Sequence, residues 1–445
     1  MPLAYRFGCA EQPLPDGVGL DLCGFLARNN PSTGQRDPLH VRALCLDDGT
    51  TKIVWAAADV LAISAQSSAR IRREAARRFG VRPRHVTVSA THTHSAPGTV
   101  FLANCGATDR GWLRAWEARV VETIGDAIRN TGTRVHAEFA DTDASGFARN
   151  RRTLKRDGSL TMGVVPPEDT VHRGPENHTL SVLTLRDAAT DRPVAAIVHF
   201  ACHAVLFCDQ LITADWPGRM LATLKREMGG GFFPMFIQGA CGDINPANLS
   251  GNPQDNLTRM GDGLAEKALE CIHRAGERQP VRLGARLGGA RLPWRSLPTE
   301  EALRERLLAP EHWHTATREQ QAVHLTAQRL IAMMRRGFLR PWATMPVQAV
   351  RAGNVVIAAL GGEILTQTGL HLAAAFPGHH LLCAAYANGS VGYLPPAEEH
   401  AYGGYEVERA HVYYGNPDAF APEAEAIARA TAENMVRSVM ADRRR

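Results

Sequence analysis

Short apolar runs alternate along the chain with longer amphipathic segments, a pattern typical of proteins that contain both strands and helices. The strand-like runs 41–46 and 52–58 flank the turn sequence DDG and predict a hairpin. Residues 64–79 follow with helical spacing and end at Gly80, a residue type that often closes helices. Similar alternation continues to the C-terminus. We therefore expect an α/β (α+β-like) fold in which mixed β-sheets are covered by helices.

One segment, 295–345, departs from this pattern because it is charged, helical and poor in strand-like runs, with Pro293, Pro341 and Pro346 near its borders. We interpret it as a helical insert or cap. A length of 445 residues is compatible with two or three domains or with one large enzyme domain. Since no low-complexity linker divides the sequence, we expect a single catalytic domain over 1–445 that includes the insert.

The amino-acid composition excludes several classes of protein. Hydrophobic residues make up 44% and charged residues 21%, which is ordinary for a folded domain and excludes extensive disorder. The net charge of +5 is slight for this length and does not predict binding to nucleic acid. The longest apolar segments are too short to cross a bilayer, so we expect no membrane insertion.

The cysteines and the N-terminus bear on localisation. The chain has nine cysteines, an odd number, without a CxxC motif, and several lie in apolar runs. This usage favours reduced, buried thiols over a disulfide framework. The N-terminal sequence carries acids and prolines where a signal peptide requires a continuous apolar stretch. We expect a soluble, cytoplasmic protein.

Candidate chemistry lies in four polar clusters, each of which directly follows a predicted strand. They are THTHSAPG at 91–98, HFACH at 199–203, GACGDINP at 239–246 and GGE at 361–363. Loops at strand ends are exposed while the strands fix their position, so α/β proteins often build their sites there. The joint appearance of the four clusters predicts one shared site.

Each cluster also has a plain structural explanation. His92 and His94, two residues apart in an extended segment, point the same way and could share a metal or a substrate, or lie in a surface loop. His203 could be a buried histidine bonded to a carbonyl, Asp243 part of a tight turn, and Glu363 a first-turn acid of a helix. Together, however, histidines from two strand ends and a carboxylate meet the needs of a zinc site.

With GGEILTQTG and the tyrosine-rich AYGGYEVERAHVYYG added, these motifs occur in an order that resembles the N-terminal catalytic domain of the neutral/alkaline (non-lysosomal) ceramidase family. The resemblance covers nearly the whole chain and is weakest across the insert. Members of that family are zinc hydrolases that cleave the amide bond of an N-acyl lipid. The resemblance therefore implies a neutral-ceramidase-like catalytic domain with bound zinc (Zn2+) and the ligands His92, His203 and Glu363.

The resemblance also implies a tyrosine as the last ligand, twelve residues before a tyrosine that holds the substrate oxygen. Tyr402 and Tyr414 have this spacing, so Tyr402 is expected on the metal and Tyr414 at the oxyanion; Tyr405 is the alternative ligand. His94 resembles a histidine that contacts substrate or supports the ligands. Arg151, in FARNRR, resembles an arginine that lines the site.

One departure affects the expected mechanism. Family ceramidases carry a serine, proposed as nucleophile, in the turn where this chain has Ile244. Isoleucine can neither attack a carbonyl nor donate a proton. Attack by metal-activated water is the remaining route, with Asp243 orienting the water or accepting its proton. His94 or Tyr414 would then stabilise the oxyanion.

Our first hypothesis is a zinc-dependent hydrolase that cleaves a carbon–nitrogen bond, amide or lactam, in a small soluble substrate. We expect such a substrate because the sequence lacks a signal and the C-terminal β-domain of the family ceramidases. The alternatives are a zinc hydrolase of an ester, lactone or carbohydrate linkage, and a non-catalytic family member that binds a ligand. Beyond the substrate we expect no nucleic-acid partner, and homo-oligomerisation stays open.

Overall fold

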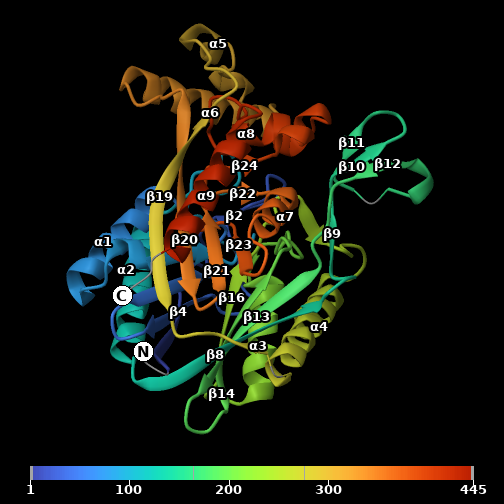
Figure 1. The fold of residues 1–445 in the computed structure, drawn as a ribbon. Coiled ribbons are helices and arrows are strands. Elements are labelled where there is room, and N and C mark those ends of the chain that lie inside the picture. The colour runs from blue at the N-terminus through green and yellow to red at the C-terminus, as the bar shows by residue number, and fades with distance from the viewer. Residues whose placement is uncertain (1–3, 164, 275, 442–445) are drawn as a thin grey trace.

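The computed structural model describes residues 4–163, 165–274 and 276–441, which form two packed β-sheets with helices on both outer faces (Figure 1). The large sheet has nine strands in the order β16-β14-β13-β8-β1-β4-β5-β6, with β18 paired to β8. The β14–β16 and β5–β6 pairs are parallel and the other pairs in this sheet are antiparallel, so the sheet is mixed. Its strands are β1 (Tyr5–Pro13), β4 (His40–Asp47), β5 (Lys52–Ala58), β6 (Val86–Ala90), β8 (Thr133–Asp143), β13 (Thr179–Asp187), β14 (Pro193–Phe200), β16 (Phe233–Gln238) and β18 (Glu277–Arg278).

The smaller sheet has four strands in the order β19-β20-β21-β23. They are β19 (Leu283–Pro293), β20 (Trp342–Ala352), β21 (Val355–Leu360) and β23 (His380–Ala384). Apolar side chains of the two sheets, such as Ile197 and Ile357, form a common core between them. Helix α9 (Ala424–Met440) packs against β19 and β20, and α7 (Thr366–Ala374) packs beside β23.

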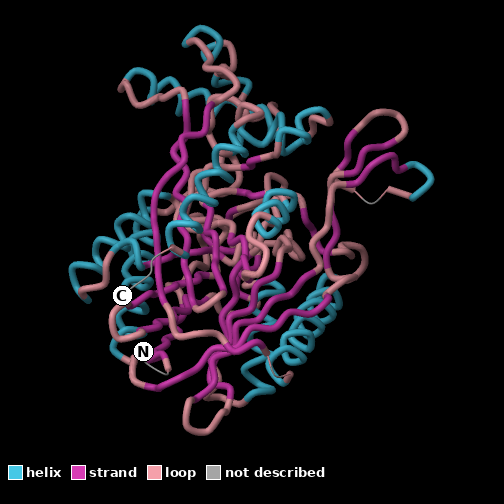
Figure 2. Tube along the Cα trace, viewed as in Figure 1, coloured by secondary structure: helices cyan, strands magenta, loops and turns pink. Residues whose placement is uncertain are grey.

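Four helices, α1 to α4, cover the far face of the large sheet, where Figure 2 shows them outside the strands. Helix α2 packs on β1, β4 and β5, and α4 packs on β8 and β13. Both faces of the large sheet are therefore buried, which explains why strands such as β14 are almost continuously apolar. The helices are α1 (Ala65–Phe79), α2 (Arg110–Arg129), α3 (Asp215–Met228) and α4 (Pro253–His273).

Two parts project from this body in Figure 1. The first is the connection between β19 and β20, which carries α5 (Glu300–Arg304) and α6 (Arg318–Arg335) and corresponds to the expected helical insert. The second is an arm of three short strands, β10 (Thr153–Lys155), β11 (Leu160–Thr161) and β12 (Thr170–Arg173). Both projecting parts lie on the side of the molecule where Figure 1 labels β22 (Glu363–Ile364), β24 (Tyr393–Leu394) and α8 (Ala410–Tyr413).

Short elements complete the described chain, and several connect the site loops. They are β2 (Leu22–Cys23), β3 (Gly34–Gln35), β7 (Ala96–Pro97), β9 (Ala148–Asn150), β15 (Leu211–Ile212), β17 (Ile244–Pro246), β22 (Glu363–Ile364), β24 (Tyr393–Leu394) and α8 (Ala410–Tyr413). No helix within the described ranges is both long enough and apolar enough to serve as a membrane span.

The expected fold class is confirmed, and so is the hairpin of β4 and β5. Helix α1 begins after Ser64, whose side chain accepts the backbone N–H of Ser67, and ends at Gly80, which has a φ of 67°. One local expectation was wrong. Glu363 does not start a helix but lies in the short strand β22, and the next helix begins at Thr366.

Candidate metal centre and active site

The carboxyl ends of β6, β14 and β16 meet, although β6 and β16 stand at opposite ends of the strand order. Gln238, the last residue of β16, donates from Nε2 to the carbonyl oxygens of Thr91, at 3.2 Å, and Cys202, at 2.7 Å. These two residues directly precede His92 and His203. A single buried amide thus fixes the two histidine-bearing strand ends side by side.

The predicted histidines His92, His94 and His203 form one cluster in which their ligand atoms lie within 4.8 Å of one another. Each Nδ1 faces a backbone carbonyl oxygen, at 2.7 Å for His92 and Leu61, 3.1 Å for His94 and Gly24, and 3.0 Å for His203 and Ile244. Because a carbonyl oxygen only accepts, Nδ1 carries the proton in each ring and Nε2 presents a lone pair. The three rings therefore have the tautomer that metal-binding histidines use.

The electrostatics of the cluster keep these rings neutral. Burial lowers the pKa of His92, and it lowers the pKa of His94 and His203 well below the usual value. The positive charge of Arg151 lowers the pKa of His203 further. Only the neutral imidazole can bind a metal ion. Because these rings are already neutral, a metal ion does not have to displace a proton from them.

Glu363 supplies the carboxylate of the cluster. Its Oε2 lies 3.6 Å from Nε2 of His92 and 3.7 Å from Nε2 of His203. The hydroxyl of Tyr386 donates to Oε2 at 2.8 Å, and the hydroxyl of Tyr414 donates to Oε1 at 2.5 Å. The carboxylate is thereby fixed between two tyrosines and two imidazoles.

The residues present fit a zinc ion. Nε2 of His203 is buried and has no hydrogen-bond partner among the described residues, although it points at the cluster. An orphaned imidazole nitrogen of this kind is costly unless a ligand completes it. Two imidazoles and one carboxylate are also a donor set that zinc prefers, with a third imidazole, His94, beside them.

The backbone around the cluster is also unusual. His92 has a φ of 67° and Tyr386 a φ of 54°, and their rings stack with centroids 3.8 Å apart. Left-handed backbone in residues other than glycine is strained and concentrates at functional sites. Gly24, at a φ of 124°, must be glycine because a Cβ there would lie 2.6 Å from Nδ1 of His94.

Tyr386 was missed by the sequence analysis, although a signal was present. It follows β23 directly, just as the four polar clusters follow their strands. Its hydroxyl bridges the buried thiol of Cys241, at 3.2 Å, and the carboxylate of Glu363. Because it stands in an otherwise apolar AAYA sequence, it reads as a core residue.

A cavity of about 300 Å³ opens beside the cluster. His94 and Glu363 line it on the side of the cluster, and Tyr414 lies with them. The rest of the wall is mostly apolar and aromatic, with Leu26, Leu61, Leu102, Cys105, Met162, Tyr393, Tyr405 and Tyr413, together with Gly24 and the charged Glu319 and Arg409. An apolar cavity with a few converging polar groups is the usual form of a small-molecule site.

The structure brings Tyr414 to the cavity but does not bring Tyr402 there. Tyr402 is 38% exposed and stacks on the ring of His172 at 5.1 Å. Tyr402 ends a short 3-10 helix at the surface, so its assignment to the metal requires correction. Tyr393 and Tyr405 are also twelve residues apart, and both line the cavity.

Tyr393 lies on the strand that pairs with the strand of Glu363. The two residues are paired in register in the parallel bridge of β22 and β24. The ring of Tyr405 lies 5.5 Å from that of Tyr393, at the start of a π-helical turn over Tyr405–Arg409. Single π-helical turns are rare in proteins as a whole, and those that occur often lie at functional sites.

Arg151 lies behind Tyr393 rather than in the cavity wall. Its guanidinium donates to the Tyr393 hydroxyl at 3.0 Å and to Oδ1 of Asn245 at 3.2 Å, and it pairs with Glu406 at 2.9 Å. The Glu406 carboxylate also pairs with Arg152. Arg151 is therefore placed to orient the Tyr393 hydroxyl.

Asp243 does not line the cavity, and its oxygens are already engaged. Oδ1 accepts hydrogen bonds from N and Oγ1 of Thr366, both at 2.8 Å, and Oδ2 accepts one from Asn150 at 2.7 Å. Burial raises the pKa of Asp243 to about 6, partly offset by these hydrogen bonds. The carboxylate joins the turn after β16 to the start of α7, which is a structural position rather than the catalytic one we expected.

The side chain of Ile244 points away from the site. It is 2% exposed and belongs to the main hydrophobic core, while its carbonyl oxygen accepts both N and Nδ1 of His203. Successive side chains of a strand face opposite sides, so in β17 it is Asn245 that faces Arg151. Ile244 therefore contributes to core packing and, through its carbonyl oxygen, to the position of His203. The polar side chain of this turn that faces the site is Asn245.

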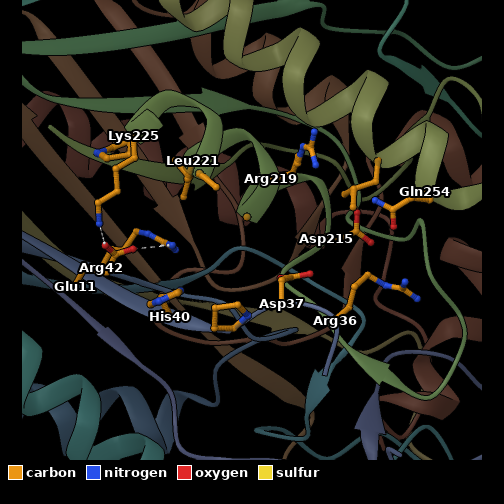
Figure 3. Close-up of a pocket in the computed structure, with 15 residues that line it drawn as sticks. Glu11, Arg36, Asp37, His40, Arg42, Asp215, Arg219, Leu221, Lys225 and Gln254 are labelled. Atoms are coloured by element: carbon orange, nitrogen blue, oxygen red, sulfur yellow. Dashed lines mark hydrogen bonds and ion pairs between the residues drawn. The ribbon is translucent and has the colours of Figure 1, made fainter. Parts of the chain in front are cut away.

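Another cavity, of about 380 Å³, lies against α3 and the start of β4 and is rich in charge (Figure 3). Its charges are largely satisfied within the protein. Glu11 pairs with both Lys225 and Arg42, as the dashed lines show, and Asp37 accepts hydrogen bonds from Thr213 and the backbone N–H of Ala214. None of the predicted site residues is among the residues described as lining it.

Comparisons with known proteins identify the family and support the fold. The family model described as "Neutral/alkaline non-lysosomal ceramidase, N-terminal" matches residues 16–271. A crystal structure of neutral ceramidase from Pseudomonas aeruginosa superposes with a TM-score of 0.75 at 21% identity, covering 97% of this chain and 74% of that one. A ceramidase complexed with C2 superposes with a TM-score of 0.76 at 19% identity, covering 98% of this chain and 75% of that one.

Proposed function

Since the chain belongs to the neutral/alkaline non-lysosomal ceramidase family, we propose that it is a zinc-dependent hydrolase that cleaves a carbon–nitrogen bond, an amide or lactam, in a small substrate. The observation that carries the proposal is the convergence of His92 and His203 on Oε2 of Glu363, at 3.6 and 3.7 Å. Neutral imidazoles and a carboxylate in a buried site beside a cavity form a catalytic zinc site rather than a binding surface.

In this proposal His92, His203 and Glu363 hold the zinc, with Tyr393 as the tyrosine on the metal. Tyr393 takes that place from Tyr402 because it pairs with Glu363 in register and keeps the twelve-residue spacing to a second tyrosine in the cavity. Bound zinc would lower the pKa of water and polarise the substrate carbonyl. Arg151 holds the Tyr393 hydroxyl in place through its 3.0 Å hydrogen bond.

The remaining steps belong to side chains that line the cavity. His94 faces the cavity with a neutral ring, and its proton on Nδ1 is held by the Gly24 carbonyl, so its Nε2 can accept a proton from the attacking water. Tyr405, twelve residues after Tyr393, donates to the oxygen of the tetrahedral intermediate. Tyr414 fixes Glu363 by its hydrogen bond.

The size of the cavity supports a small substrate. About 300 Å³ is at the lower end of the range for ligand pockets, which runs from roughly 300 to 1,000 Å³. The wall is apolar near Leu61 and Leu102, which suits a short acyl group. The charged side chains of Glu319 and Arg409 complete the lining and suit a polar group on the substrate.

Metal analysis joined to a substrate panel tests the proposal. The purified protein should hold about one zinc per chain, and His203→Ala should lose both the zinc and the activity. His172→Ala, at an exposed histidine, is the matched control and should keep both. The panel compares N-acetyl amides, lactams, esters and a long-chain ceramide.

The outcomes separate the hypotheses. Turnover of short amides or lactams supports the proposal. Turnover confined to esters would instead identify the protein as an ester hydrolase. Efficient cleavage of the long-chain ceramide would overturn the small-substrate part. Protein that binds no zinc would overturn the whole proposal.

A further inference from the structure

A polar cavity on the far side of the site loops has no part in the chemistry proposed above. It measures about 270 Å³ and shares no lining residue with the active-site cavity within the described chain. It lies where the space between the two sheets opens beside α7 and β23, so its floor comes from the large sheet and its cover from Leu370, Leu381 and Leu382.

The floor carries a row of three polar residues on neighbouring strands. Asp141 of β8 pairs in register with Ser181 of β13, and Ser181 pairs in register with His199 of β14. Residues in register on adjacent strands share a face, and all three line the cavity. Apolar residues such as Phe139 and Ile197, two positions away on the same strands, point into the core between the sheets.

Two of these residues, His199 and Ser181, are buried, whereas Asp141 is exposed to solvent. His199 is 7% exposed, and its Nδ1 has no hydrogen-bond partner among the described residues. The Ser181 hydroxyl, in a residue 3% exposed, likewise makes no hydrogen bond within the described chain. A buried ring nitrogen without a partner costs stability, so a ligand that donates a hydrogen bond to Nδ1 of His199 would be bound favourably.

The tautomer of His199 defines what such a ligand must offer. Its Nε2 lies 2.9 Å from the carbonyl oxygen of Cys383, which only accepts, so Nε2 carries the proton. Burial lowers the pKa of His199, which keeps the ring neutral and leaves Nδ1 as an acceptor. The Asp141 carboxylate is an acceptor as well, because Arg274 donates only to its backbone oxygen.

We propose that this cavity binds a small hydroxylated amine, whose ammonium group pairs with Asp141 and whose hydroxyl group donates to Nδ1 of His199 beside the Ser181 hydroxyl. Two acceptors select a ligand that brings two donors, and a carboxylate selects a positive charge for one of them. The leucines of the cover contact the carbon chain between the two groups. The site does not depend on the metal centre.

Ethanolamine is the probe because it contains both groups, and ethylene glycol and ethylamine each lack one. Calorimetric titration of the full chain should show saturable binding of ethanolamine that is weaker for ethylamine and weakest for ethylene glycol. Asp141→Asn should reduce the ethanolamine affinity about tenfold or more, since charge-assisted hydrogen bonds are the strong ones. Asp143→Asn is the matched control, because Asp143 lies on the same strand and binds Ser145 outside the cavity.

A second readout locates the ligand and covers a variant that fails to fold. Ethanolamine should shift the ¹⁵N resonance of His199 Nδ1, and Ser181→Ala should weaken binding severalfold. The inference is overturned if ethanolamine gives no saturable binding, if ethylene glycol binds equally well, if Asp143→Asn weakens binding as much as Asp141→Asn, or if the His199 resonance does not move.

Discussion

At the residue scale, the candidate centre depends on which tyrosine completes the metal site, Tyr393 or Tyr402. Tyr393→Phe removes the hydroxyl that Arg151 orients at 3.0 Å and that we assign to the metal, and we expect kcat/KM to fall at least about 10- to 100-fold, the loss typical even for partners of metal ligands. Tyr402→Phe should leave kcat/KM within a factor of about two, because an exposed side chain away from the cavity contributes little.

Steady-state kinetics of both variants, with zinc content measured alongside, decide between the two tyrosines. A large loss for Tyr402→Phe together with normal turnover for Tyr393→Phe would restore the assignment made from the sequence. Loss of zinc in Tyr393→Phe would place its oxygen on the metal, whereas loss of turnover with full zinc would place it on the substrate.

Tyr386 should act on the metal through Glu363. Tyr386→Phe deletes the 2.8 Å hydrogen bond to Oε2 but keeps the ring that stacks on His92. Partners of metal ligands typically contribute about 10- to 100-fold in metal affinity, and we expect a loss of that size. Competition with a chelator of known affinity measures it, and an unchanged zinc affinity would contradict this role.

The sequence made the histidines and Glu363 predictable because each comes directly after a strand, where the fold exposes side chains in a fixed place. It did not distinguish the tyrosines, since the pair Tyr393 and Tyr405 has the same spacing as the pair that we assigned. What selects Tyr393 is the pairing of β22 with β24, a contact between distant segments that no local pattern contains.

At the scale of elements, the start of α3 holds a titratable group that couples to pH. Asp215 begins this helix with a φ of 57°, and burial raises its pKa to about 7, partly offset by hydrogen bonds from the backbone N–H groups of Trp216 and Leu206. An acid with a raised pKa holds its proton more tightly when folded. Its contribution to stability therefore falls as the pH rises from about 4, its ordinary value, to about 7.

Asp215→Asn removes this titration. As the pH rises from about 4 to about 7, the free energy of unfolding of the variant should increase relative to that of the wild type. The increase should reach up to about 1.4 kcal/mol per pH unit, because one pKa unit corresponds to that energy. Denaturant unfolding at pH 5, 6, 7 and 8 measures the difference. Parallel profiles for the two proteins would show that the carboxyl group does not titrate differently on folding.

The helical insert contributes to the wall of the cavity but contains none of the proposed metal ligands. Arg318, at the start of α6, donates to the backbone oxygens of Leu26 and Arg28 and to Oδ1 of Asn29, next to the cavity residue Leu26. We expect Arg318→Gln to raise KM severalfold with little change in kcat, since it loosens the wall and leaves the reacting groups in place. Arg336→Gln, at an exposed arginine of the same insert, is the control and should change neither constant.

The insert also shows where prediction at this scale stops. Charge predicted helices in this segment, and apolar runs predicted strands such as β4 and β5, but β20 begins at Trp342, inside the range 295–345 that we assigned to the insert. The strand β8, which joins β1 to β13 and carries Asp141, was not predicted, although Val135, Ala137 and Phe139 alternate with polar residues in its sequence. Its strand conformation comes from pairing on both edges.

At the scale of the whole molecule, the candidate centre joins the two sheets. His92 and His203 follow strands of the large sheet, whereas Glu363 follows β21 of the small one, and the backbone N–H of Gly242 donates to the carbonyl oxygen of Ile364 between them. A metal held by all three residues would cross-link loops from both sheets. Its binding energy would then be part of the folding energy, because the unfolded chain has no such site.

Removal of the metal should therefore lower Tm and not only the activity. A ligand present at about 100 times its dissociation constant stabilises the folded state by about 2.7 kcal/mol, which for a chain of this size corresponds to a shift of a few degrees. We expect EDTA to lower the Tm of the wild type by that amount, zinc to restore it, and His203→Ala to be insensitive to both. If the wild type lost its zinc to EDTA with no change in Tm, the ion would bind the unfolded chain as tightly as the folded one, and it would contribute nothing to holding the two sheets together.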